Sequence, residues 1–332
     1  MKRLSLCLTI AAGILLFGIG VWMKAQEAVV GEFEILLCNS VVKDLEMKNS
    51  WEAAKAAGVK GIEVHVDPDL SCPHLTGGIR PYNFEDRDEA SRLGVDGLNN
   101  GIMVPVVVAP IQLNPREIEE KGAPEWALTL IRSAPFAGVK LIYFPIVTEN
   151  FTETTIPDDR FIELSVYLLN DLVAESHRSG VAIALENLSV YWNRPEVLQK
   201  VLAEFSDEEL GLCLDPINFY WFGHPKNRVY DLVRDFLPRT WHFHAKNLRY
   251  PVRNREEQRE PGWKYAESTI PVDEGDLDFE QLVGYMLDAG FNGYISIEDD
   301  SLGKLKPNER LKVLKREIEY LRKVTAGYRG RN

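Results

Sequence analysis

VAIALE at residues 181–186 is the first of four short apolar runs that end in a side chain able to bind a metal ion. The others are GLCLD at 211–215, WHFH at 241–244 and YISIE at 294–298. In each run the last side chain is in phase with small or polar residues, whereas the alternate positions are large and apolar. Because side chains alternate between the two faces of a strand, this phase predicts strands whose two faces meet different neighbours.

The run WHFH illustrates the expected alternation. His242 and His244 are predicted to share one face, and Trp241 and Phe243 the other. Parallel barrel strands need such a pattern, because one face points at a crowded axis and the other packs beneath helices. Such barrels carry their chemistry at the C-terminal ends of the strands. One site is therefore expected from the four terminal side chains: Glu186, Asp215, His244 and Glu298.

Eight strand candidates alternate with helix-length stretches along the chain. The strands are expected near 33–39, 61–66, 102–108, 139–146, 181–187, 210–215, 240–246 and 293–298. The amphipathic stretches are expected near 43–57, 85–97, 116–136, 158–179, 194–205, 226–236, 278–290 and 306–323. Apolar strands joined by helical connections indicate a parallel sheet, and eight such repeats indicate that the sheet closes into a barrel. The predicted α/β fold is a single (β/α)8 TIM barrel over residues 27–332.

The N-terminus carries an apolar stretch, residues 4–23, that follows Lys2 and Arg3 and precedes Lys24. This arrangement predicts an export signal over residues 1–26, and hence a periplasmic or extracellular protein. The apolar part is long for a cleaved signal, and no clean small-x-small site follows it. A retained membrane anchor is the alternative.

Charge and cysteine content narrow the possible partners. The formal net charge of the 332-residue chain is −12, and it becomes −15 without the three basic residues of segment 1–26. Such a balance repels phosphate backbones and argues against a nucleic-acid partner. Beyond residue 26 the cysteines are Cys38, Cys72 and Cys213, an odd and widely spaced set that provides no disulfide framework. Cys213 is expected as a small core residue.

The order of the residues at the four strand ends, Glu, Asp, His and Glu, resembles that of the xylose isomerase-like barrel superfamily. The resemblance is to its sugar isomerase and epimerase branch in particular. The resemblance covers essentially the whole chain after the export segment. It is carried by ALEN at 184–187, CLDPIN at 213–218, HAKN at 244–247 and ISIED at 295–299. It implies a divalent Mn, Mg, Co or Zn ion and a homo-oligomer. The metal ligands that it implies are Glu186, Asp215, His244 and Glu298.

The donor types support such an ion independently. Three carboxylates and one imidazole make a hard, mostly oxygen site that suits Mn or Mg and also accepts Zn. An ion that binds a carbonyl and the neighbouring hydroxyl of a sugar acidifies the proton between them. Glu186 and Glu298, which approach from different strands, are the expected base and acid for that proton.

The resemblance implies an isomerase or epimerase that acts through an enediolate on a carbohydrate or keto-sugar. A lyase that dehydrates a keto-inositol or a 3-keto-glycoside shares the first proton transfer, so it stays open. A noncatalytic sugar-binding barrel is the alternative of another class. Zinc-dependent DNA-repair endonucleases of the superfamily need additional histidines, and the strand MVPVVVAP at 103–110 has none.

Six residues are candidate substrate contacts: Glu63, His65, Asn218, Lys246, His224 and Trp263. Glu63 and His65 share the inward face of the second strand. Lys246 lies one step beyond the metal-ligand histidine on the same face, where a surface salt bridge is equally compatible. His242, one layer deeper, is interpreted as a hydrogen-bonded core histidine.

The remaining candidates lie in connections above the barrel. Asn218 occupies a position where related epimerases often carry a histidine, which leaves the substrate open. His224 begins a helix, and Trp263 belongs to the long connection 248–276. Both that connection and the segment 67–85 are long enough to act as lids or specificity elements.

Overall fold

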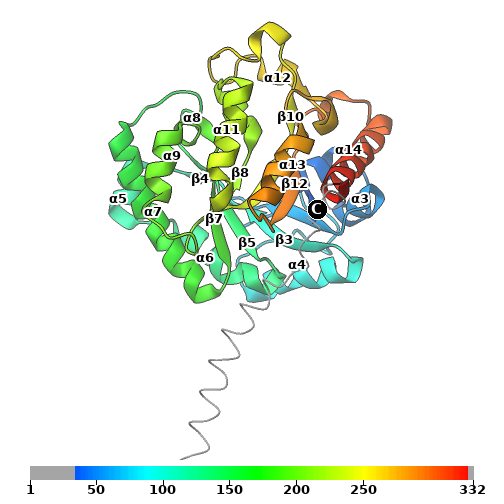
Figure 1. Cartoon of the computed structure of the whole chain (residues 1–332). Coiled ribbons are helices and arrows are strands. Elements are labelled where there is room, and N and C mark those ends of the chain that lie inside the picture. The colour runs from blue at the N-terminus through cyan, green and yellow to red at the C-terminus, as the bar shows by residue number, and fades with distance from the viewer. Residues whose placement is uncertain (1–33, 328–332) are drawn as a thin grey trace, which may run out of the picture.

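The computed structural model describes residues 34–327, which form a closed barrel of parallel strands (Figure 1). The barrel strands follow one another in the order β1-β12-β9-β8-β7-β5-β3-β2, and β2 closes on β1. Their bounds are β1 Ile35–Cys38, β2 Gly61–His65, β3 Met103–Val108, β5 Leu141–Phe144, β7 Ala182–Glu186, β8 Gly211–Leu214, β9 Thr240–Ala245 and β12 Tyr294–Ile297. Each strand lies within its expected range, so the predicted (β/α)8 fold is confirmed.

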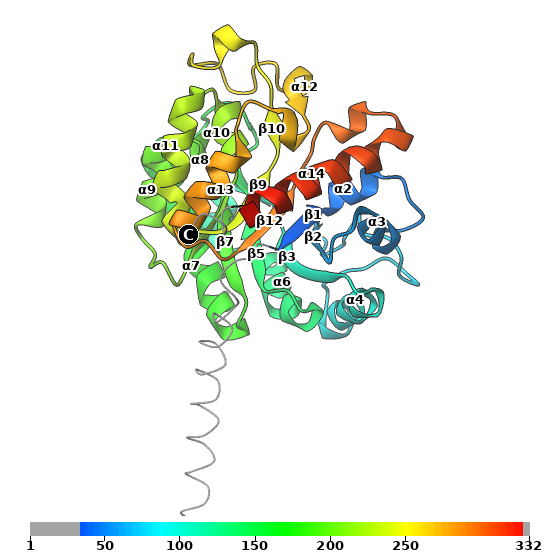
Figure 2. The same ribbon diagram turned by 45° about the vertical axis from the view of Figure 1, so that its right-hand side comes forward.

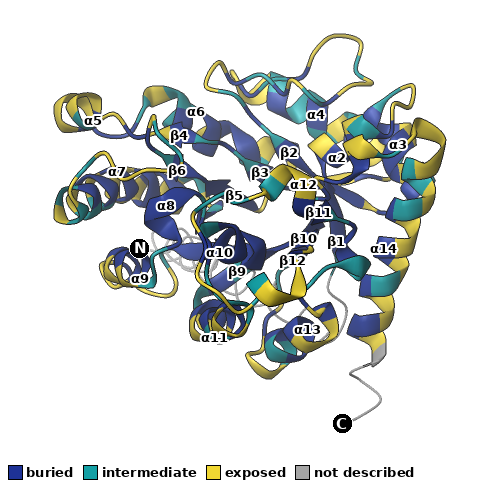
Figure 3. Cartoon of the chain, turned by 90° about the horizontal axis from the view of Figure 1, so that it is seen from above, coloured by how far each residue is buried: buried dark blue, intermediate teal, exposed yellow. Residues whose placement is uncertain are grey.

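Helices surround the barrel in Figure 2. Figure 3 shows that their buried faces lie toward the strands and their exposed faces outward. The α-helices are α2 Asn39–Asp44, α3 Ser50–Ala57, α4 Arg87–Asn100, α5 Pro115–Lys121, α6 Glu125–Ser133, α7 Asp158–Ser179, α8 Ser189–Trp192, α9 Pro195–Leu202, α10 Pro216–Phe222, α11 Lys226–Phe236, α12 Tyr265–Ser268, α13 Phe279–Asp288 and α14 Pro307–Gly327. Short 3₁₀ helices are η1 Ala134–Ala137, η2 Leu237–Arg239, η3 Val252–Asn254, η4 Val272–Glu274 and η5 Leu302–Lys304.

Two of the expected helical stretches are each divided in the structure. The stretch 43–57 splits because α2 ends at Asp44, and Asn49 then caps α3 by accepting a hydrogen bond from the backbone N–H of Glu52 at 2.9 Å. The stretch 116–136 splits at Gly122, whose φ is +72°, and at Pro124, which has no backbone N–H to continue a helix. Local capping residues therefore override the amphipathic pattern.

The core has two layers, a large one between the strands and the helices and a small one inside the barrel. The outer layer holds the large apolar side chains of the strands. The interior holds a small buried cluster, Leu36, Val106, Leu141, Tyr143, Ala184 and Cys213. Polar groups occupy the C-terminal part of the interior, above this cluster.

Trp241 departs from the predicted alternation. Leu212 pairs with Thr240 and Cys213 pairs with His242, so Trp241 is the extra residue of a β-bulge. Its ring packs against the interior cluster, over Gly211, where a Cβ atom would lie 2.1 Å from Trp241 Cδ2. The prediction that Trp241 faces outward is therefore wrong, whereas His242 keeps its expected inward phase.

The two long connections differ in how they are held. Residues 67–85 pack on the outer helices, since Trp51 Nε1 donates to the Tyr82 hydroxyl at 3.2 Å and that hydroxyl donates to Asp96 at 2.8 Å. Residues 248–276 rise above the C-terminal end of the barrel in Figures 1 and 2 and carry α12. A small sheet, β10 Asn247–Leu248 with β11 Thr269–Ile270, joins the two ends of the second connection. Another small sheet, β4 Ile111–Gln112 with β6 Ile146–Val147, lies just beyond β3 and β5.

The expected export segment, residues 1–26, lies outside the described residues. Within residues 34–327, no helix has the length and apolar character needed to cross a membrane.

Candidate metal centre and active site

Four potential metal ligands meet at the C-terminal end of the barrel. Glu186 ends β7, Asp215 directly follows β8, His244 lies in β9 and Glu298 directly follows β12. One ligand atom from each lies within 4.8 Å of the others. The structure therefore brings together all four residues that the sequence singled out.

His244 presents its Nδ1 atom to the three carboxylates. The distances from Nδ1 are 3.3 Å to Glu298 Oε2, 3.5 Å to Glu186 Oε1 and 3.9 Å to Asp215 Oδ2. This nitrogen is buried and has no hydrogen-bond partner. A buried ring nitrogen among three carboxylates is stable only with a proton or a cation between them. The donor set therefore fits a divalent ion.

The backbone around Asp215 is fixed by neighbouring groups. Its Oδ1 atom caps α10 by accepting hydrogen bonds from the N–H of Ile217 at 2.8 Å and of Asn218 at 3.3 Å. The side chain of Asn187 accepts from the Asp215 N–H at 2.8 Å and donates to the Asp215 carbonyl at 2.9 Å. Asp215 Oδ2 consequently stays directed at the site.

Lys246 places a positive charge beside two of the ligands. Its Nζ atom lies 2.8 Å from Asp215 Oδ2 and 3.0 Å from Glu298 Oε2, and only 6 % of the residue is exposed. Burial acts to lower the pKa of Lys246, but Asp215 and Glu298 outweigh it and raise the pKa well above its usual value. Lys246, which the sequence suggested as a substrate contact, thus also pairs with two of the four potential metal ligands.

The two candidate catalytic glutamates have different acidities. Burial raises the pKa of Glu186, which accepts a hydrogen bond from Asn218 Nδ2 at 3.2 Å. Burial also acts to raise the pKa of Glu298, but Lys246 and His244 outweigh it and lower the pKa to about 2. Unequal acidity in a pair of carboxyl groups is what acid and base catalysis requires.

A second polar layer lies beneath the ligands, centred on Glu63. Its Oε1 atom accepts hydrogen bonds from the Tyr143 hydroxyl at 2.6 Å and the Cys38 thiol at 3.3 Å. Its Oε2 atom lies 2.7 Å from His242 Nε2 and 3.4 Å from His244 Nε2. Burial acts to raise the pKa of Glu63, but the two histidines outweigh it and lower the pKa well below its usual range.

A pocket of about 240 Å³ opens beside the ligands. Glu63, Tyr143, Glu186 and Glu298 belong to its polar side, and His65 lines it near Asp67, whose Oδ1 lies 3.0 Å from His65 Nε2. Its other lining residues are Asn39, Ser40, His74, Val108, Pro110, Pro145 and Leu188. A larger hollow of about 330 Å³ lies on the outer surface between α5, α6 and α7, away from the four ligands.

A family model of the xylose isomerase-like TIM barrel matches residues 51–324. The chain belongs to the xylose isomerase-like TIM barrel family. The match covers β2 through most of α14 and includes all four ligands. No curated protein sequence matches the chain significantly.

Solved structures with this fold include two metal-bound proteins and a sugar epimerase. A xylose isomerase-like TIM barrel protein from Mycobacterium smegmatis, in complex with magnesium, is 15 % identical with a TM-score of 0.64, covering 89 % of this chain and 97 % of its own. The zinc-bound IOLI protein is 17 % identical with a TM-score of 0.63, covering 87 % and 98 %. The 3-keto-D-glucoside 4-epimerase YcjR from E. coli is 14 % identical with a TM-score of 0.61, covering 88 % and 99 %.

The probable 3-DHS dehydratase AsbF from Bacillus anthracis shares the fold as well. It is 14 % identical with a TM-score of 0.55, covering 87 % of this chain and 98 % of its own. Sugar epimerases and a dehydratase thus occur on one architecture. At these identities the likeness shows a common fold and leaves the activity to the site itself.

Of the six expected substrate contacts, Glu63 and His65 line the pocket. Asn218 and Lys246 do not line it but contact Glu186 and Glu298 at its edge, and the other two lie away from it. His224 Nε2 lies 2.8 Å from the Asn193 carbonyl oxygen, and Trp263 packs on Tyr250 with ring centroids 5.6 Å apart. Neither residue lines the pocket. His224 instead fixes the turn between α10 and α11, and Trp263 helps to hold the long connection against the barrel.

Two tyrosines at the site were not singled out from the sequence. Tyr143 is in the inward phase of its strand, so the alternation of residues 141–144 could have revealed it. Tyr265 lies on α12, where its hydroxyl donates to Asp300, and Lys246 acts to lower the pKa of Tyr265 against the stronger effect of burial. No periodic signal marks a residue in such a short helix.

Proposed function

We propose that this protein is a divalent-metal-dependent isomerase or epimerase of a carbohydrate or keto-sugar. The observation that supports it most is the unpartnered His244 Nδ1 directed at three carboxylates at the catalytic end of the barrel. Glu186, Asp215, His244 and Glu298 would hold the ion. When bound, the ion supplies Lewis acidity toward a carbonyl and an adjacent hydroxyl of the substrate.

The protein's own groups would move the proton. Glu186, whose pKa is raised by burial, is the stronger base and takes the proton from the carbon next to the carbonyl. Glu298 follows β12, which lies three positions from β7 in the barrel, so it approaches from another direction. Because its pKa is lowered, it can return a proton there only after taking one up from solvent. Asn218 orients Glu186 through the 3.2 Å hydrogen bond to its Oε1 atom.

The pocket favours an uncharged substrate of about one sugar ring. Its volume of about 240 Å³ is below the 300–1,000 Å³ that is common for drug-sized ligands. No lysine or arginine occurs among the described residues that line it, so a phosphate group would meet no cation there besides the proposed ion and Lys246 at the edge of the site. Asn39 Nδ2, a buried donor without a partner, and His65 offer hydrogen bonds to hydroxyl groups.

A lyase is the second candidate, and Lys246 is the observation that favours it. Loss of a β-hydroxyl from the enediolate requires a proton donor at the leaving oxygen. The Lys246 ammonium, 3.0 Å from Glu298 Oε2, is such a donor at the edge of the site. The two reactions share the first proton transfer and differ in the fate of the intermediate.

Proton exchange in deuterated water tests the proposed function. The full-length protein, stripped of metal and reloaded with Mn²⁺, would be incubated with ketoses, inososes and 3-keto-glycosides while proton NMR follows exchange and products. We expect deuterium to enter next to a carbonyl, and a chelator, Glu186→Gln and Glu298→Gln each to abolish the exchange. Glu319→Gln, an exposed change on α14, is the matched control and should leave exchange intact.

The products distinguish the candidates. An epimer or the isomeric aldose or ketose supports the first candidate, and an unsaturated or dehydrated ketone supports the lyase. Sugar binding without exchange, unaffected by either glutamine substitution, would contradict both and indicate a noncatalytic sugar-binding barrel.

Export is also part of the proposal, and its support is the apolar stretch 4–23 with flanking basic residues. Cell fractionation with N-terminal sequencing tests it. A mature chain that begins after residue 26 indicates a cleaved signal, and an intact chain in the membrane fraction indicates an anchor. An intact chain in the cytoplasm would contradict export.

A further inference from the structure

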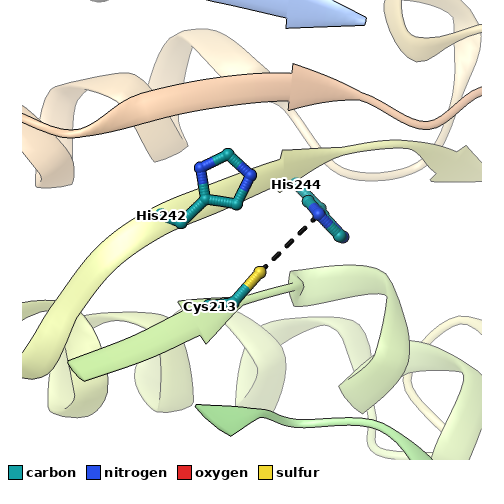
Figure 4. A group of neighbouring side chains, drawn as sticks. All are labelled: Cys213, His242 and His244. Carbon is teal, nitrogen blue, oxygen red and sulfur yellow. Dashed lines mark hydrogen bonds between the residues drawn. The ribbon is translucent and has the colours of Figure 1, made fainter. Parts of the chain in front are cut away.

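His244 touches different groups at its two ring nitrogens. Nδ1 faces the three carboxylates, at 3.3 to 3.9 Å. Nε2 lies 3.4 Å from Glu63 Oε2 and 3.6 Å from Cys213 Sγ, and Figure 4 shows the Cys213 contact with His242 beside it. A neutral imidazole carries one proton, and only the tautomer with the proton on Nε2 leaves Nδ1 free to bind an ion.

The two neighbours of Nε2 differ in what they can do. The Cys213 thiol can donate or accept a hydrogen bond, so it is compatible with either tautomer. An ionised carboxylate only accepts, so Glu63 attracts a proton on Nε2 and is repelled by a lone pair there. The contacts of Glu63 are those of an acceptor, because the Tyr143 hydroxyl donates to its Oε1 atom at 2.6 Å.

Glu63 is held rigidly enough for this role. It is 2 % exposed, and donors on three other strands approach it: Cys38 on β1, Tyr143 on β5 and His242 on β9. Both carboxylate oxygens are therefore in use within the protein. A carboxylate held in this way cannot swing toward a substrate without breaking buried hydrogen bonds.

We propose that Glu63 is a positioning residue that keeps the His244 proton on Nε2 and thereby presents Nδ1 to the metal ion. The inference rests on the proposed metal site and replaces the substrate contact that the sequence suggested for Glu63. Carboxylates that orient metal-binding histidines in this manner commonly contribute a factor of about 10 to 100 to metal affinity.

The same layer does not need a second ion. Cys213, His242 and His244 lie close enough to share one. However, His242 Nε2 lies 2.7 Å from Glu63 Oε2, which is the length of a charge-assisted hydrogen bond. That bond joins His242 Nε2 to Glu63, so we assign a hydrogen-bonded network to this layer.

Metal titration with matched variants tests the proposal. Co²⁺ binding would be followed through its visible absorption in the full-length wild type, Glu63→Gln and Cys213→Ala. We expect Glu63→Gln to weaken binding by about 10- to 100-fold. Cys213→Ala should keep the wild-type order of magnitude, because the thiol does not select the tautomer. Equal affinity in wild type and Glu63→Gln, a large loss in Cys213→Ala alone, or two bound Co²⁺ ions in the wild type would each overturn the proposal.

A spectroscopic measurement on the wild type does not depend on the variants folding. In zinc-loaded protein with ¹⁵N-labelled histidine, the His244 signals should show a metal-bound Nδ1 and a protonated Nε2. A metal-bound Nε2 would overturn the assignment. The two proposals fail differently: a wild type that binds no divalent ion contradicts the function, whereas normal binding in Glu63→Gln contradicts only the role of Glu63.

Discussion

At the scale of single residues, Lys246 should affect metal binding and catalysis in opposite directions. Its ammonium, within 3.0 Å of oxygens on Asp215 and Glu298, neutralises the ligands and repels a cation placed between them. The same charge can stabilise a negative oxygen that develops on the substrate. A residue that only supported the fold would affect both properties in the same direction.

We therefore predict that Lys246→Met binds Mn²⁺ at pH 8 at least as tightly as the wild type, while turnover falls about 100-fold. The pKa of Glu298 should rise from about 2 toward its usual value, so metal affinity should be lost at a higher pH as the solution is acidified. Metal titrations across pH, together with steady-state rates, check both parts. Lys312→Met, on the exposed side of α14, is the control. Parallel losses of affinity and turnover would argue for a structural role.

The alternation of side chains singled out the four candidate metal ligands because each lies at or near the end of a strand, where its nearest neighbours alternate regularly. The same reasoning explains what was missed. Tyr265 comes from the four-residue helix α12, which has no periodic pattern, and His224 and Trp263 were assigned from their place in a connection without knowledge of its path. Trp241 was assigned to the wrong face because a β-bulge adds one residue without a sequence signal.

At the scale of elements, Asn247 attaches the long connection to the barrel directly after β9. Its Oδ1 atom accepts from the N–H of Leu248 at 3.0 Å and of Leu277 at 3.2 Å. Its Nδ2 atom donates to the carbonyls of Val272 at 2.8 Å and Leu277 at 2.9 Å. Gly275 makes this possible, since a Cβ there would lie 2.0 Å from Asn247 Cγ. The connection that carries α12 thus begins and ends at one side chain.

Asn247→Ala should lower the free energy of unfolding by about 2–4 kcal/mol, because it leaves buried backbone groups without partners. It should also reduce turnover, since Tyr265 depends on the same connection. Chemical denaturation and steady-state rates measure the two effects. Asn292→Ala, at an exposed position before β12, is the control and should change little. A stable Asn247→Ala with full activity would show that the connection is held elsewhere.

Helix α14 contacts the long connection 248–276 through a buried carboxyl group, Glu317. Its Oε1 atom accepts from the N–H of Val272 at 2.6 Å, and its Oε2 atom is buried without a partner. Burial, and then the nearby Asp299, raise the pKa of Glu317 well above its usual value. A carboxyl group with a raised folded-state pKa stabilises the fold below its unfolded-state pKa, and this stabilisation is lost as the pH rises through the folded-state pKa.

Glu317→Gln removes this titration and keeps an oxygen acceptor for Val272. We predict that the variant is more stable than the wild type at pH 8, by about 1–3 kcal/mol, and that the difference shrinks toward pH 4.5. Thermal and chemical denaturation at several pH values provide the measurement. A constant difference across that range would mean that Glu317 does not titrate as proposed.

The divided helices show what limits prediction at this scale. The expected stretches 43–57 and 116–136 each span more than one helix, because Asn49 and Pro124 decide where α3 and α6 begin. Such local caps are visible in the sequence, although their strength relative to an amphipathic pattern is set by the packing around them.

At the scale of the whole molecule, the barrel brings the ligands together from strands that are distant in the sequence. Glu186 and Glu298 are separated by more than one hundred residues, and parallel closure places both at the same end. Alternation of strands and helices was sufficient to predict this closure. The shape of the pocket was not predictable, because it depends on where the long connections pack.

Because ligands from β7, β8, β9 and β12 share one site, ion binding should stabilise the whole barrel. At a free Mn²⁺ concentration 100 times the dissociation constant, the expected gain is about 2.7 kcal/mol. Calorimetry with and without a chelator should therefore show Tm lowered by several degrees on metal removal. Asp215→Asn should abolish this difference, whereas Asp159→Asn, on an exposed turn of α7, should preserve it.

The proposed metal centre holds one divalent ion between Glu186, Asp215, His244 and Glu298. Crystals grown with Mn²⁺ and measured at a wavelength where manganese scatters anomalously test it most directly. We expect one strong anomalous peak about 2.0–2.3 Å from the carboxylate oxygens and from His244 Nδ1. A saturated crystal with no peak there, or with its peak at another group of residues, would contradict it.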